Sequence, residues 1–223
     1  MTPTTGLRLV AHAHTAALRR AVFGAGDDDL DEGGRRAALA LAGQGRGGPL
    51  GTGERCLTSP AVAAVQTAYA LGLRPTVEAA LADCGYGGWS GRSLADVGAR
   101  EPDALRRWWE TPEAAPHGGE SLVALRERVG AWLDGGLGGG GRVVAVTHPM
   151  VVRVAVGHVL QLPTASLSRL DVAPLAVVRL SRHGSRWQLQ FTAPPVGSAA
   201  AGAPAIGGPP GPVRPGRRPD AAG

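Results

Sequence analysis

Two histidines follow the first apolar segment of this chain and are its first candidates for chemistry. Leu7, Leu9 and Val10 form a short apolar run, and His12 and His14 come after it, ahead of an alanine-rich stretch. This pattern predicts a buried strand that ends at the histidines and is followed by a helix. Open α/β sheets bind their ligands at the carboxyl ends of the strands, so a histidine at this edge is well placed for catalysis.

Four further polar residues occupy comparable positions along the chain. Ser59, followed by a proline, comes after a second apolar run and begins a helical pattern. Asp83 precedes a glycine-rich turn, and Glu120 stands in a Gly-Glu-Ser sequence before another helical pattern. His148 ends a run that is rich in valine. We expect the residues that follow the strands to meet His12 at one edge of the sheet.

The order and spacing of these residues resembles the histidine phosphatase superfamily, the phosphoglycerate-mutase-like group, from about residue 7 to about residue 191. The resemblance implies a phosphomonoesterase in which His12 attacks phosphorus and becomes phosphorylated, Asp83 protonates the departing oxygen, and His148 completes the pocket. It also implies that the partner is a small phosphorylated molecule and that no cofactor or metal ion is needed. The residues then expected to contact the substrate are His14, Thr15, Ser59 and Glu120.

The chain differs from the family at two positions where the family has arginine. The Arg-His-Gly signature of the family reads Ala11-His12-Ala13 here, and a second phosphate-binding arginine reads Ala63. Arginine binds two phosphate oxygens through its planar fork and stays charged, which alanine cannot do. By analogy with arginine fingers, the loss of one such group costs on the order of a thousandfold in rate. The arginines near the motifs that could replace the charge are Arg19, Arg92 and Arg153.

Two other positions also differ from the family. Asp83 stands where glutamate is commoner, which shortens the proton donor by one methylene, although burial would raise its pKa toward a useful range. His14 stands where the family often has a carboxylate, and a protonated imidazole there would add a weaker, pH-dependent positive charge. The only literal Arg-His-Gly of the chain is at 182–184, where Gly184 and a serine predict a hairpin turn rather than a catalytic signature.

The alternation of short apolar runs with helical patterns predicts an α/β fold, a three-layer sandwich with a mostly parallel sheet flanked by helices. Residues 1–192 are predicted to form this domain, and the Pro-, Gly- and Ala-rich residues 193–223 a disordered tail. The predicted strands are 7–10, 55–58, 77–81, 142–146, 176–181 and 186–191. The predicted helices are 15–22, 35–41, 59–71, 94–109, 122–133 and 151–160.

Composition argues against two classes of partner. The formal charge of +5 comes from arginine alone, because the chain has no lysine, and the abundance of Ala, Gly, Pro and Arg indicates a GC-rich genome. The arginines are also scattered along the chain. We therefore expect no nucleic-acid partner. No segment approaches the ~20 apolar residues of a membrane span, and the N-terminus lacks a basic region followed by an apolar run. We expect a cytoplasmic protein with no membrane partner, and the sequence carries no signal for an oligomeric state.

Three functional hypotheses follow. The first is a phosphomonoesterase with a rebuilt pocket that acts through His12, with His148 and Asp83 assisting. The second is a degenerate phosphatase fold that binds a ligand or a partner without turnover. The third takes His12 and His14 as a metal-binding pair, because His-x-His at the end of a first strand resembles the metal-dependent amidohydrolases. It fits poorly, because such enzymes are barrels of about 250 residues or more with further histidine and carboxylate ligands.

Overall fold

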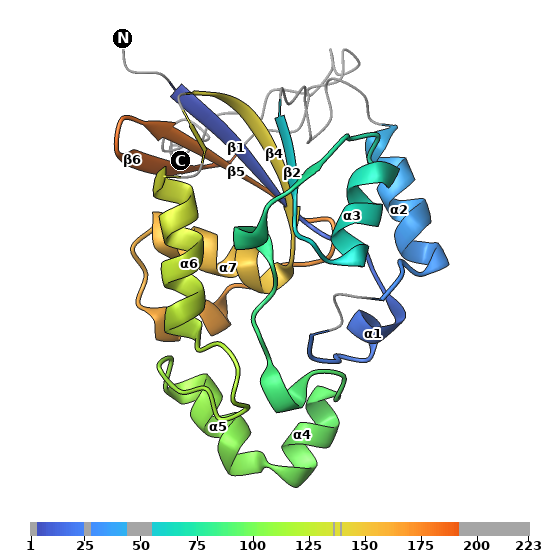
Figure 1. The fold of residues 1–223 in the computed structure, drawn as a ribbon, viewed down its shortest axis with the longest axis vertical. Helices are drawn as coiled ribbons and strands as arrows, with labels where there is room; N and C mark the ends of the chain where they lie inside the picture. The colour runs from blue at the N-terminus through green and yellow to red at the C-terminus, as the bar shows by residue number, and fades with distance from the viewer. Residues whose placement is uncertain (1–3, 25–27, 44–54, 136, 139, 192–223) are drawn as a thin grey trace, which may run out of the picture. The chain divides into compact units, whose positions relative to one another are not determined.

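The computed structural model describes residues 4–24, 28–43, 55–135, 137–138 and 140–191 (Figure 1). These residues all belong to one compact unit, Met1–Thr192. The tail predicted at residues 193–223 lies outside the described residues, so the division into a domain and a disordered tail stays a prediction. No helix in the described part of the chain is long and apolar enough to cross a membrane.

A six-stranded sheet forms the centre of the described residues, with the strand order β3-β2-β4-β1-β5-β6. Strands β1 and β4 are parallel neighbours, β2 runs parallel to both β4 and β3, and β5 is antiparallel to β1 and to β6. The mostly parallel α/β sheet predicted from the sequence is therefore confirmed. The strand bounds are Thr4–Ala11 (β1), Arg55–Thr58 (β2), Thr76–Val77 (β3), Gly141–Thr147 (β4), Val177–His183 (β5) and Arg186–Gln190 (β6).

Helices cover both faces of this sheet (Figure 1). Alternate residues of β1 point to opposite layers: Leu7 and Leu9 pack with α6 and α7, whereas Val10 packs with α2 and α3. The helices α4 and α5 lie together at the lower end of the view in Figure 1. The helix bounds are Ala16–Arg19 (α1), Glu32–Ala42 (α2), Val62–Ala70 (α3), Leu94–Arg100 (α4), Pro102–Glu110 (α5), Leu122–Gly135 (α6) and Pro149–Val159 (α7).

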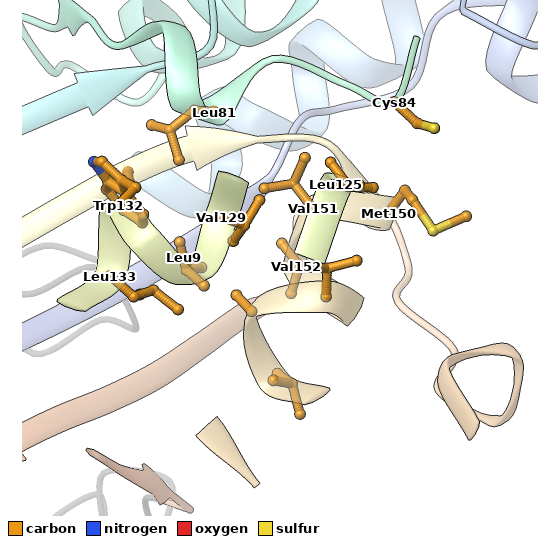
Figure 2. Close-up of a cluster of buried hydrophobic side chains, with 14 of the residues drawn as sticks. Leu9, Leu81, Cys84, Leu125, Val129, Trp132, Leu133, Met150, Val151 and Val152 are labelled. Carbon is orange, nitrogen blue, oxygen red and sulfur yellow. The ribbon is translucent and has the colours of Figure 1, made fainter. Parts of the chain in front are cut away.

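Helix α7 is anchored in the larger core cluster, which fixes the histidine at its N-terminus. Figure 2 shows Val151 and Val152 of α7 packed among Leu125 and Val129 of α6 and Leu9 of β1. All five side chains are fully buried. Burial of one such side chain stabilises the fold by about 1.5–3 kcal/mol, so this contact holds α7 firmly against the sheet.

Several predicted elements have other bounds in the structure. The strand predicted at 77–81 was wrong beyond Val77, because a 3₁₀ turn, Ala79–Leu81, follows and the Glu78 side chain accepts a hydrogen bond from the Ala80 amide. The helix predicted at 94–109 is two helices. Helix α4 ends before Pro102, which has no amide to continue it and begins α5 instead.

Two further predicted helices are shorter than expected. The helix predicted at 15–22 is the single turn α1, because Ala21 has a positive φ of 49° that no α-helix accommodates. The helix predicted at 59–71 begins only at Val62, because Ser59 and Pro60 form the turn before it, and the Ser59 hydroxyl accepts from the Ala61 amide at 3.2 Å.

Candidate active site

The carboxyl ends of β1, β2 and β4 meet at one edge of the sheet and carry the predicted polar residues. Pairing aligns Ala11 of β1 with Thr147 of β4, so the residues that follow these strands, His12 and His148, come together. Their imidazole rings lie 5.0 Å apart between centroids and at 78° to each other. The parallel arrangement of strands thus joins two histidines that are 136 residues apart in the sequence.

His12 is held in one orientation by two hydrogen bonds. Its backbone amide donates to the Thr147 carbonyl at 2.8 Å, and its Nδ1 lies 2.8 Å from the Ala13 carbonyl oxygen. A carbonyl oxygen only accepts, so Nδ1 carries the hydrogen and the neutral ring keeps its lone pair on Nε2. Next to it, the Ala13 amide donates to the Thr67 hydroxyl of α3 at 3.0 Å. The side chain is therefore buried, fixed, and in the tautomer of a nucleophile.

His148 stands directly before α7 and has polar neighbours at both ring nitrogens. Its Nε2 lies 2.8 Å from the hydroxyl of Ser59, which follows β2. Its Nδ1 lies 3.6 Å from the Oδ2 of Asp83. Ser59 therefore orients the second histidine, and the Asp83 carboxyl group reaches the same edge of the sheet from the loop after the 3₁₀ turn.

Burial sets the protonation of this cluster. Desolvation lowers the pKa of His12 to about 4, with the neighbouring His148 adding to the shift. Desolvation also lowers the pKa of His148 to about 4, assisted by the positive charge of Arg128. The same cause raises the pKa of Asp83 to about 6, because a buried carboxylate loses hydration. Between about pH 4 and pH 6, neutral imidazoles thus face a protonated carboxylic acid.

Arg128 of α6 holds the loop that carries Asp83. Its guanidinium donates to the carbonyl oxygens of Ala80, Ala82 and Asp83 at 2.8, 3.1 and 3.2 Å. It also forms a two-point ion pair with Glu120, with distances of 2.9 Å for Nε to Oε1 and 2.8 Å for Nη2 to Oε2. Arg128 is a positioning residue that the sequence reasoning missed. Its place two helical turns after Glu120, with an arginine's reach, is the signal that could have found it.

Replacement of Arg128 by methionine is expected to lower the free energy of unfolding by about 2–3 kcal/mol. The change leaves three carbonyl oxygens and the Glu120 carboxylate without their donor in a largely buried place. Urea denaturation followed by circular dichroism measures this loss. Arg106→Met is the matched control, because Arg106 pairs with Asp103 on the surface and its loss should cost less than about 1 kcal/mol. Equal losses in the two variants would contradict the assigned role.

A cavity of about 480 Å³ opens at this edge of the sheet. It is lined by four of the predicted site residues, namely His12, His14, Asp83 and His148. The Nδ1 of His14 is buried and has no hydrogen-bond partner among the described residues. The structure thus brings the proposed nucleophile, acid and second histidine into one cavity together with a third imidazole.

The other three predicted site residues are not among those that line the cavity. Thr15 caps α1, with its hydroxyl accepting from the Leu18 amide at 3.0 Å. Ser59 contacts His148, and Glu120 pairs with Arg128, as described above. In this structure, these three side chains therefore make contacts within the protein and do not line the cavity.

Of the three arginines near the motifs, Arg153 lines the cavity. Its Nε is buried without a hydrogen-bond partner in the described part of the chain, and its Nη2 lies 3.6 Å from Asp171, a carboxylate that is 97% exposed. Arg19 instead pairs with Asp31, and Arg92 pairs with two carboxylates, on other surfaces. Arg153 is thus the cation, among the described residues lining this cavity, with an unused donor.

Positions 11 and 63 hold small buried side chains. Ala11 ends β1 and Ala63 lies in the first turn of α3, and both are fully buried. Within the described ranges, no group of three or more His, Cys, Asp or Glu side chains is arranged to hold a metal ion.

Comparison with known proteins agrees with this geometry. The bifunctional protein Rv2228c of Mycobacterium tuberculosis is 31% identical over 191 residues, which cover 82% of this chain and 52% of that protein. The chain therefore spans about half the length of the first curated relatives it matches. The glucosyl-3-phosphoglycerate phosphatase of Mycolicibacterium vanbaalenii is 32% identical over 151 residues, covering 61% of this chain and 65% of that protein.

Solved structures lead to the same family. The native mycobacterial glucosyl-3-phosphoglycerate phosphatase Rv2419c superimposes with a TM-score of 0.70 at 28% identity, covering 83% of this chain and 97% of that one. The same phosphatase has also been solved with VO3 and with inorganic phosphate. The profile of the histidine phosphatase superfamily (branch 1) matches residues 7–193. The chain belongs to this branch of the histidine phosphatase superfamily.

Proposed function

We propose that the chain is a phosphomonoesterase that acts through a phosphohistidine intermediate on His12. One observation carries the proposal: a neutral, hydrogen-bonded His12 shares a cavity with His148 and with an Asp83 carboxyl group of raised pKa. These are the groups that attack on phosphorus and protonation of a leaving alcohol require. Two of the similar proteins are glucosyl-3-phosphoglycerate phosphatases, and one of them has been solved with VO3 and with inorganic phosphate, which supports the same reaction class.

The reaction runs in two steps. In the first, the lone pair on Nε2 of His12 forms a bond to phosphorus while the bond from phosphorus to the ester oxygen breaks. Asp83 gives its proton to that oxygen, so the product leaves as a neutral alcohol. In the second, the oxygen of a water molecule forms a bond to phosphorus while the bond from phosphorus to Nε2 of His12 breaks. Asp83 takes a proton from that water, inorganic phosphate is released, and the lone pair returns to Nε2.

The charge of the phosphoryl group needs a cation, and we assign this role to Arg153. We take positions 11 and 63 to be those at which relatives bind phosphate with arginine, and both are alanine here. Arg153 lines the cavity and has a buried Nε with no partner in the described chain. Its planar guanidinium can bind two phosphate oxygens at once.

Release of inorganic phosphate from a panel of phosphomonoesters tests the proposal. The wild-type protein at about pH 5 should release phosphate well above an enzyme-free blank from at least one ester. A folded protein that releases none from any ester would overturn it. The buried alanines at positions 11 and 63 would then favour the second candidate, a protein of this fold that binds a ligand without turnover.

The rate should depend on pH as a bell with its maximum near pH 5. His12 must be neutral to attack, so kcat/KM falls as the pH drops through about 4, where His12 is protonated. Asp83 must hold a proton, so kcat/KM also falls as the pH rises through about 6. The Asp83→Asn variant should have a lower kcat/KM, and its kcat/KM should no longer fall near pH 6. The Asp83→Glu variant should still show a fall in kcat/KM as the pH rises, because it keeps a titrating carboxyl group. A wild-type rate that climbs steadily beyond pH 7 would contradict these assignments.

A further inference from the structure

The residues that line the cavity are of two chemical kinds. The charged and titratable residues that line it are His12, His14, Asp83, His148 and Arg153. The other lining residues in the described chain are almost all apolar. They include Phe23, Leu94, Trp108, Trp109, Met150 and Val172. The polar part suits a phosphate group, so the apolar part is left for the organic group attached to it.

The apolar residues that line the cavity are here called the wall. The aromatic residues of the wall pack against one another. Phe23 lies 5.2 Å from Tyr86 and 5.7 Å from Trp108 between ring centroids, and Trp108 lies 4.6 Å from Trp109. Trp108 is fully buried, and Trp89 packs against it from a neighbouring turn at 5.9 Å. A wall fixed in this way loses little conformational freedom when a ligand binds, so its apolar surface contributes fully to affinity.

This wall offers few partners for a polar organic group. The polar side-chain atoms in the apolar part of the described lining are the phenol of Tyr86 and the indole N–H groups of Trp108 and Trp109, and that of Trp108 is buried. A sugar placed there would lose the water around several hydroxyl groups and would find too few side-chain partners to replace it. Each hydroxyl group left unpaired lowers the affinity by at least several-fold. The wall therefore disfavours phosphorylated sugars and polyols.

Apolar residues continue to the rim of the cavity. Trp109 of α5 and Leu94 of α4 both line it, and they are 36% and 37% exposed. Covering large apolar side chains that are in contact with water strengthens binding in proportion to the area that the ligand covers. A ligand with an apolar group would cover this rim as well as the wall.

We propose that the substrate is a phosphomonoester of an apolar alcohol, with an aromatic or branched aliphatic group that packs against Phe23 and Trp109. This specificity rests on the proposed phosphomonoesterase function. It adds that the organic part, and not the phosphate alone, is selected by the residues of α4 and α5 that line the cavity.

Two primary alkyl phosphates with leaving alcohols of similar acidity test the class. In 2-phenylethyl phosphate the organic group is apolar, and in glucose 6-phosphate it carries hydroxyls. The wild-type kcat/KM for the first should exceed that for the second by about 10-fold to 100-fold, the factor that burial of such a group supplies. Equal values, or a preference for the sugar, would overturn the proposed class while leaving the phosphatase function intact.

A substitution in the wall should reduce this preference. Trp109→Ala is expected to lower the ratio of the two kcat/KM values by about 3-fold to 10-fold, because the packed ring area is lost. Tyr69→Ala is the matched control, since Tyr69 is an exposed aromatic residue of α3 that does not line the cavity. Its ratio should equal that of the wild type, and an equal fall in both variants would contradict the role of Trp109.

A binding measurement separates this inference from the reaction. Calorimetric titration of the His12→Ala variant with each ester measures affinity without turnover. Tighter binding of 2-phenylethyl phosphate supports the apolar class even if the wild type hydrolyses neither ester, in which case only the phosphatase proposal fails. Equal or weaker binding of 2-phenylethyl phosphate would overturn the class whatever the wild-type rates.

Discussion

Replacement of His12 by alanine is expected to reduce phosphate release on the order of 10⁴-fold or more. The alanine side chain has no lone pair to attack phosphorus, so the covalent route is lost, and such losses are the largest that single substitutions cause in enzymes of this kind. The smaller side chain fits the space that His12 fills, so the fold should persist. Steady-state release of phosphate at about pH 5, with circular dichroism as a check on folding, measures the effect.

The chain offers a matched histidine for this comparison. His183 follows Arg182 and precedes Gly184 in the literal Arg-His-Gly, but it lies at the exposed end of β5, where a turn joins β5 to β6. His183→Ala should release phosphate at the wild-type rate. An equal loss in both variants, or no loss in His12→Ala, would remove the proposed nucleophile.

Replacement of Arg153 by methionine is expected to lower kcat/KM by about 10²-fold to 10³-fold. The change keeps much of the side-chain volume and removes the cation that we assign to the phosphoryl group. Lysine at the same position keeps a positive charge but cannot bind two oxygens with one planar group, so Arg153→Lys should recover part of the rate. Initial rates over a range of ester concentrations give kcat and KM separately for each variant.

Arg19→Met controls for the loss of an arginine near the same motif. Arg19 is half exposed and pairs with Asp31, and it does not line the cavity. Its replacement should change kcat/KM less than about threefold, since exposed ion pairs contribute little. If Arg153→Met behaved like Arg19→Met, the phosphoryl charge would have to be balanced by another group, and His14 also lines the cavity.

Local sequence patterns predicted most of the sheet. The apolar runs before His12 and His148 lie in β1 and β4, which the structure confirms. The pattern failed after Val77, because Ala79 and Ala80 carry no preference for a strand and a local side-chain hydrogen bond favours a 3₁₀ turn. The single helix predicted through Pro102 ignored a break that proline signals in the sequence itself.

The site was predictable where residues follow strand ends, and less so where long side chains cross between elements. His12 and His148 meet because parallel strands end together, which the sequence order already suggested. The contacts of Arg128 with three carbonyl oxygens depend on how α6 packs beside the 3₁₀ turn, and no local pattern encodes that distance. Likewise, the sequence does not tell which of Arg19, Arg92 and Arg153 reaches the site, because that depends on which of them lines the folded cavity.

The central claim is that His12 carries the phosphoryl group during turnover. Rapid quenching of the wild-type enzyme during hydrolysis of 2-phenylethyl phosphate, followed by mass spectrometry of its peptides at alkaline pH, tests it directly. We predict phosphate on the imidazole of His12, formed at a rate no slower than kcat and absent from His12→Ala. Sustained release of phosphate by the wild type, with no phosphate found on His12 at any quench time, would contradict the account.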